Sequence, residues 1–80
     1  MDKLQLLADV QNIMRDVLDE PDIVLSETST ANDVEGWDSL THIQLIVAIE
    51  KYFKIKFSSK EILSWNNVGE VLDAIALRLN

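Results

Sequence analysis

The chain of 80 residues contains no cysteine, only two glycines and a single proline. Without thiols it can form neither disulfides nor thiolate metal sites, and this composition fits a reducing compartment. So few turn-forming residues argue against a fold built from many short strands. The longest uncharged apolar run, residues 45–49, is far too short to cross a membrane. The first residues lack the pattern of a signal peptide, so we expect a cytoplasmic protein.

Basic residues are also scarce, because seven lysines and arginines stand against fourteen aspartates and glutamates, for a net charge of −7. Phosphate backbones bind to basic faces, so nucleic acid is not an expected partner. Residues 1–38 carry ten acidic and two basic side chains (−8), whereas residues 39–80 carry four and five (+1). Such acidity can serve solubility alone, but its uneven placement bears on how partners would dock.

Residues 3–18 have the apolar period of an amphipathic helix. Asp9, Arg15 and Asp16 are expected on its other faces, and Pro21 discourages its continuation. The side chains assigned to the core recur at three- and four-residue steps: Leu4, Leu7, Val10, Met14 and Val17.

Residues 19–38 form a polar, turn-like stretch. A connection of this length is unusual in a compact domain and is typical of a functional loop. We expect Ile23, Val24 and Leu25 to anchor its first half to the core and Val34 to anchor its second half.

Residues 39–53 predict a second helix, capped by Asp38 or Ser39. This helix is apolar on more than one side, which we interpret as one surface for the core and one for a partner. The alternative is that neighbouring helices bury both surfaces. The buried face is assigned to Leu45, Ile46, Ile49 and Phe53, and the second stripe to Leu40, Ile43 and Val47.

Two capping patterns predict the remaining helices. Ser58-Ser59-Lys60-Glu61 opens a short helix over residues 59–65, and Asn67-Val68-Gly69-Glu70 opens the last one. The core face of that last helix is assigned to Val68, Val71, Leu72, Ile75 and Leu79. We therefore expect one all-α domain spanning residues 1–80, with three longer helices, one short helix and a long loop between the first two.

Ser39 lies where the polar loop turns into the second helix. Nucleophilic catalysis would need a base and an orienting group nearby. His42 and Asp38 are close in sequence, but all three share one helix end, and the G-x-S-x-G elbow is absent. His42 is therefore expected at the surface. Metal-ligand spacings and glycine-rich phosphate loops are missing too, so we do not expect an enzyme.

A serine without its own base indicates a residue that another enzyme modifies, although Asp38 and Ser39 could simply cap the helix. The stretch Gly36-Trp37-Asp38-Ser39-Leu40 and the helix that follows it resemble the modification site of an acyl carrier protein. Ala48-Ile49-Glu50, Ile55-x-Phe57 and Asn67-Val68-x-Glu70 extend the resemblance over essentially the whole chain.

The resemblance implies a four-helix bundle whose Ser39 receives 4′-phosphopantetheine from coenzyme A, through a separate Mg²⁺-dependent phosphopantetheinyl transferase. Acyl-type cargo would then ride on the thiol of this arm as a thioester. The resemblance also implies a monomer that meets acyl-loading and acyl-transfer enzymes through its second helix. The recognition residues would be Asp38, Leu40, Ile43, Val47 and Glu50.

The sequence also departs from the fatty-acid carriers that it resembles. Thr41, Gln44 and Lys51 stand where such carriers often have acidic residues, which favours a specialised lipid, polyketide or related pathway, or an aminoacyl or peptidyl cargo. Trp65 stands where a smaller aliphatic often lines the cargo cavity. With Phe57 and Ile62 it would reshape a cargo pocket, unless it serves core packing alone. The competing hypothesis is an unmodified helical interaction module.

Overall fold

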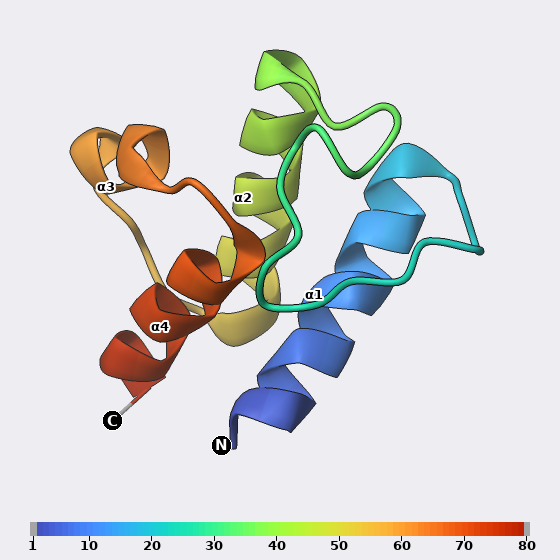
Figure 1. Cartoon of the computed structure of the whole chain (residues 1–80). Coiled ribbons are helices and arrows are strands. Elements are labelled where there is room, and N and C mark those ends of the chain that lie inside the picture. Colours follow the sequence, from blue (N-terminus) through green and yellow to red (C-terminus); the bar gives the residue numbers. More distant parts are fainter. Residues whose placement is uncertain (1, 80) are drawn as a thin grey trace.

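The computed structural model describes residues 2–79, and these residues form four helices and no strand (Figure 1). The helices are α1 (Lys3–Leu18), α2 (Ser39–Phe53), α3 (Ser59–Ser64) and α4 (Val68–Leu79). The predicted all-α class and the long loop between α1 and α2 are confirmed. Trp65 was expected inside the short helix but follows it, with the extended angles φ −74° and ψ 132°.

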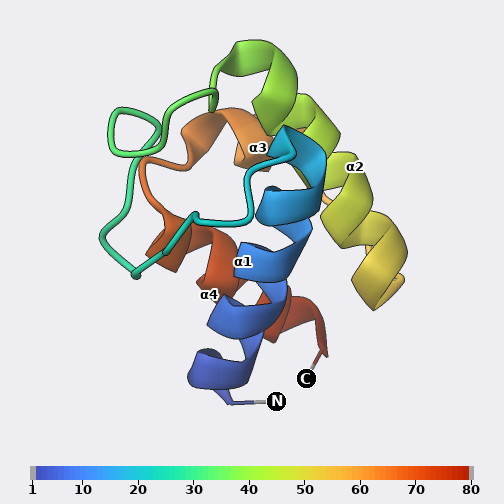
Figure 2. The same cartoon turned by 90° about the vertical axis from the view of Figure 1, so that its right-hand side faces the viewer.

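The three longer helices form a bundle, and α3 sits at one end of it. α1 and α2 run antiparallel, and α4 ends at the end of the bundle where α1 begins (Figures 1 and 2). α3 lies toward the opposite end, where α2 begins. The fully buried side chains come from all three longer helices: Leu6, Val10 and Met14 from α1, Ile46 and Ile49 from α2, and Val68, Val71, Leu72 and Ile75 from α4.

The buried face of α1 differs from the predicted one. Leu4 is 78% exposed, whereas Leu6 and Ile13, which the sequence analysis did not assign to the core, are buried. Asp9 is also buried, at 9% exposure, and its Oδ1 accepts a hydrogen bond from Gln5 Nε2 at 3.1 Å. The reason is that α1 packs against both α2 and α4, so a wider sector of the helix is covered than one stripe provides.

Two further core assignments are corrected. Val24 points to solvent between the half-buried Ile23 and the buried Leu25, because successive side chains of an extended segment alternate in direction. Leu79 is exposed in the last turn of α4, while the other four assigned residues of that helix are buried. Val34 is buried, as predicted.

The first half of the long loop is fastened to α1 by side-chain hydrogen bonds. Gln11 Oε1 accepts a hydrogen bond from the N–H of Leu25, and Arg15 Nε donates one to the carbonyl of Ile23, each at 2.8 Å. These bonds satisfy backbone groups that lie outside regular structure. The loop therefore follows a defined course across the bundle (Figure 2).

The middle of the loop is fastened to the first turn of α4. The N–H of Val68 donates to the carbonyl of Ser29 at 2.9 Å, and the N–H of Gly69 donates to the carbonyl of Glu27 at 2.7 Å. A Cβ on Gly69 would lie only 2.9 Å from that carbonyl oxygen. Glycine is needed here because the loop approaches the helix backbone so closely.

Candidate functional site

Ser39 is exposed as the first residue of α2, at the end of the bundle away from the start of α1 (Figure 1). Asp38 is the N-cap, and its Oδ1 accepts the N–H groups of Leu40 and Thr41, each at 3.0 Å. Of the two predicted caps, the structure therefore selects Asp38. The Ser39 hydroxyl is not needed to start the helix.

The Asp38 carboxylate places a negative charge directly beside Ser39. The hydrogen bond from the Thr41 N–H is the main cause that holds the pKa of this exposed carboxyl below its usual value of 3.8. Asp38 is therefore ionised at neutral pH. A carboxylate also suits this position because it interacts favourably with the positive end of the helix dipole.

Gly36 and Thr41 set the direction from which the chain enters α2. Gly36 has a φ of +88°, a conformation that glycine adopts without steric cost. The Thr41 hydroxyl donates to the Gly36 carbonyl at 2.7 Å and accepts from the Asp38 N–H at 2.8 Å, which completes a capping box. Neither role was predicted from the sequence, although an Asp followed three residues later by Thr could have indicated the role of Thr41.

His42 was expected at the surface, but it is partly buried and its ring is held on both sides. Trp37 Nε1 donates a hydrogen bond to His42 Nδ1 at 3.1 Å, so the ring proton lies on Nε2, which is 3.2 Å from the Ile62 carbonyl oxygen. Because both ring nitrogens are engaged in this way, His42 is not placed to act as a base for Ser39. The cluster of Ser39, His42 and Asp38 is therefore not a catalytic triad.

A groove of about 250 Å³ opens beside Ser39, between the start of α2 and α3. Two of the three residues predicted to line a cargo pocket, Ile62 and Trp65, belong to its wall, whereas Phe57 does not. Phe57 instead packs edge-on against Trp65, with ring centroids 5.0 Å apart. The lining is mostly apolar and aromatic, and it comprises Ala31, Trp37, Asp38, Ser39, His42, Ile62, Leu63, Trp65, Asn66, Asn67 and Val71.

The predicted second stripe of α2 is exposed. Leu40, Ile43 and Val47 have exposed fractions of 67%, 47% and 43%, which excludes the alternative that neighbouring helices bury both surfaces. Glu50, the last of the predicted recognition residues, is half-buried. Its Oε2 accepts the N–H of Phe57 at 2.8 Å, so this carboxylate also holds the connector after α2.

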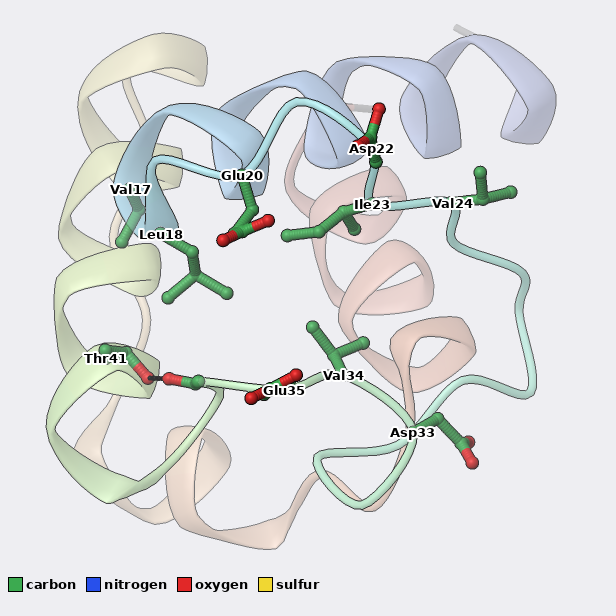
Figure 3. A pocket seen from close by; sticks show the side chains of 11 residues that line it. Val17, Leu18, Glu20, Asp22, Ile23, Val24, Asp33, Val34, Glu35 and Thr41 are labelled. Atoms are coloured by element: carbon green, nitrogen blue, oxygen red, sulfur yellow. Dashed lines mark hydrogen bonds between the residues drawn. The ribbon is translucent and has the colours of Figure 1, made fainter.

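A second hollow, of about 680 Å³, lies on the other side of the α2 N-terminus, between the end of α1 and the loop. Leu18, Ile23 and Val34 point toward its centre, whereas Val24 points away (Figure 3). Its remaining lining includes four carboxylates, from Glu20, Asp22, Asp33 and Glu35. The acidity of residues 1–38 is thus gathered partly around this hollow.

Neither a metal centre nor a membrane span is found in the part of the chain that the structure describes. Within residues 2–79, no group of three histidine, aspartate or glutamate side chains is placed to hold a metal ion. The helices of this region are also too short or too polar to cross a membrane.

Comparison with known proteins gives consistent matches. Residues 8–75 match the model of a family described as a phosphopantetheine attachment site. The acyl carrier protein of Thermosynechococcus vestitus is 34% identical over 76 residues, which are 94% of this chain and 93% of the relative. That of Cyanidium caldarium is 33% identical over 79 residues, covering 98% and 91%. The solution structure of a holo acyl carrier protein from Geobacter metallireducens superposes with a TM-score of 0.86 at 40% identity, covering 92% of this chain and 85% of that one.

Proposed function

Because the chain belongs to the acyl carrier proteins, whose covalent cofactor is 4′-phosphopantetheine, we propose that Ser39 is its attachment residue. Members of this family are carriers and not enzymes. The single observation that carries the proposal is an exposed serine at a helix N-terminus, beside an apolar groove and without a base of its own. This setting fits the group, since a transferase can reach the exposed hydroxyl and the positive end of the α2 dipole lies beside it.

The attachment chemistry would be supplied by the transferase, with Mg²⁺ and coenzyme A. The Ser39 Oγ forms a bond to the phosphorus on the pantetheine side of the coenzyme A diphosphate. The bond to adenosine 3′,5′-bisphosphate breaks, and the serine proton passes to a base of the transferase. Once bound, the arm supplies a thiol, with a reference pKa of about 8.5, that can form and exchange thioesters.

Partner enzymes would dock on the exposed stripe of α2. Leu40, Ile43 and Val47 form an apolar surface that begins at Ser39 and is not needed for the core. Asp38 adds a charge at the end of the stripe where the reaction takes place. Glu50 contributes less to recognition under this proposal, because one of its oxygens is engaged with Phe57.

The cargo is proposed to belong to a specialised lipid, polyketide or related pathway. Thr41, Gln44 and Lys51 lie on α2, while much of the acidity lies in the preceding loop around the second hollow. Docking dominated by an acidic α2 is therefore not the expected form of recognition. An aminoacyl or peptidyl cargo on the same arm is the alternative, and a cytoplasmic location stays a prediction.

The test is the intact mass of the protein after incubation with coenzyme A, Mg²⁺ and a broad-specificity phosphopantetheinyl transferase. We expect one added phosphopantetheine on the wild type and none on Ser39→Ala. Ser59→Ala is a matched control, because Ser59 is also an exposed first residue of a helix, and it should be modified normally. A folded wild-type protein that gains no mass would favour the unmodified interaction module.

A further inference from the structure

A hollow lined by lysines lies at the end of α2 that is farther from Ser39 (Figure 1). It has a volume of about 420 Å³, and we call it the lysine hollow. Three lysines, one glutamate and two aliphatic residues line it: Lys51, Lys54, Lys56, Glu50, Val47 and Ile55. The hollow is thus basic in a chain whose net charge is −7.

The ammonium groups of this hollow have no ion-pair partner within residues 2–79. In that range the salt bridges are made by Lys3 and Arg78, whereas the lysines of the hollow are exposed. Glu50 is the one carboxylate of the lining, and its Oε2 accepts the N–H of Phe57 at 2.8 Å. The lysine hollow therefore offers positive charge to a group from outside the protein.

The stability of α2 accounts for only one of the three lysines. Lys51 lies in the last turn, where a cation interacts favourably with the negative end of the helix dipole. Lys54 is the C-cap and has the left-handed angles φ +58° and ψ 49°, a conformation that favours glycine. Lys56 lies beyond the cap, in the connector to α3. The needs of the helix end therefore leave two of the lysines unexplained.

The lysine hollow continues the exposed apolar stripe of α2. Val47 is the last residue of the stripe and also lines the hollow. Ser39 and Lys51 are separated by about 18 Å along the helix, at a rise of about 1.5 Å per residue. A protein interface of ordinary size, with roughly 800 Å² per partner, is wide enough to span this distance. A partner that works at Ser39 and lies along the stripe therefore also reaches the lysine hollow.

The two ends of α2 have surroundings of opposite charge. The second hollow, beside the start of the helix, includes four carboxylates, and Asp38 adds another at the cap. The lysine hollow at the other end has three ammonium groups. An acidic segment placed at the start of α2 would meet like charges, whereas at the end of α2 it meets opposite ones. Such an arrangement sets which way round a partner lies on the helix.

On the premise of the proposed function, in which partner enzymes dock along α2, we propose that the lysine hollow binds a carboxylate-rich segment of such an enzyme. The carboxylates pair with the three lysines, and an apolar side chain beside them rests on Val47 and Ile55. A nucleic acid or an anionic bilayer fits less well, because the net charge of −7 repels an extended polyanion. Ion pairs at exposed lysines contribute more to orientation and to the rate of association than to affinity.

The experiment is a peptide titration of the full chain, followed by two-dimensional ¹H–¹⁵N NMR. The probe is a helical peptide with leucine and glutamate on one face, and two control peptides carry glutamine or lysine in place of each glutamate. We expect the glutamate peptide to shift the backbone amides of Val47, Lys54 and Ile55 to saturation, and added salt should weaken its binding. The glutamine peptide should bind about tenfold more weakly. The lysine peptide should leave these amides unshifted.

Matched variants separate the position of a lysine from its charge. Replacing all three lysines of the hollow, by Lys51→Gln, Lys54→Gln and Lys56→Gln together, should raise the Kd of the glutamate peptide about tenfold, since each exposed ion pair contributes little. Lys60→Gln removes the charge of an exposed lysine on α3 that does not line the hollow. This control should leave the Kd unchanged.

Lys54→Gly tests whether this lysine serves the helix end instead. Glycine adopts the left-handed conformation of residue 54 without steric cost, so the melting temperature should not fall. The Kd of the glutamate peptide should nevertheless rise, by roughly twofold to fivefold. A variant that melts at a lower temperature but binds as tightly as the wild type would overturn the role given to Lys54.

Three further outcomes would overturn the proposal. Equal affinity for the glutamate and glutamine peptides would show that the charge of the hollow is not read. The same amide shifts with duplex DNA, or with vesicles of phosphatidylcholine and phosphatidylglycerol, would make the hollow a site for any polyanion. Shifts that follow the protein concentration without peptide would make a second copy of the chain the occupant.

Failure of the proposed function is seen separately. The titration does not require Ser39 to be modified, so it can be carried out whatever the transferase does. A protein that binds the glutamate peptide but gains no mass with the transferase would contradict the attachment at Ser39 alone. A protein that gains the expected mass but does not bind the peptide would contradict only the role of the lysine hollow.

Discussion

The two faces of α2 carry the same kinds of side chain but meet different surroundings. Leu45, Ile46 and Ile49 are packed against the other helices, whereas Ile43 and Val47, one or two positions away, remain about half exposed. Burying an aliphatic side chain stabilises the fold by about 1.5–3 kcal/mol. The half-exposed side chains of the stripe contribute much less of this stabilisation. Exposed apolar surfaces of this kind mark interaction sites. The comparison therefore separates the residues that hold the fold from the exposed residues that we propose meet partner enzymes.

The largest expected effect is the loss of stability on truncating the buried face. Ile49 is fully buried, so Ile49→Ala should lower the free energy of unfolding by about 2–5 kcal/mol, through lost burial and the cavity left behind. Ile43→Ala removes the same atoms from the exposed face and should lower the free energy of unfolding far less. Urea unfolding of both variants measures the difference. Equal losses would mean that the two faces are not distinct.

The next effect concerns recognition and should appear on the exposed face. Val47→Asp places a charge in the apolar stripe, so we expect kcat/KM for modification by the transferase to fall roughly tenfold, the equivalent of about 1.4 kcal/mol. The melting temperature should change little, because Val47 is not part of the core. Leu77→Asp is a matched control, since Leu77 is an exposed apolar residue on α4. A similar loss in both variants would show that added charge matters more than its place.

How far the sequence could predict this arrangement depends on how local each signal is. The helix limits were predicted to within about a residue, because capping is a local interaction, as in the box formed by Ser58 and Glu61. The buried face of α1 was misassigned because Leu4 and Leu6 both fit a helical period. Only the packing of α1 against α2 and α4 decides between them.

The same limit applies to the candidate site. Ser39 and the exposed stripe could be predicted, because the residues that indicate them belong to one helix and its cap. The role of His42 does not, since its ring joins Trp37 to the carbonyl of Ile62, twenty residues further along the chain. Nothing in the spacing of these three residues indicates that they meet. The groove was therefore predicted only in part, through Ile62 and Trp65.

The smallest expected effect concerns the cap from which both faces of α2 start. The folded-state pKa of Asp38 is lowered, so its charge stabilises the fold above the unfolded-state value of 3.8, and this contribution is lost as the pH falls through the folded value. Asp38→Asn keeps a capping oxygen but removes the charge. Its melting temperature should lie slightly below that of the wild type at pH 7, and the gap should shrink on acidification below about pH 4. A gap that widens on acidification would contradict the assigned direction. A loss as large as that of Ile49→Ala at pH 7 would mean that the cap, and not the buried face, is what chiefly holds α2 in place.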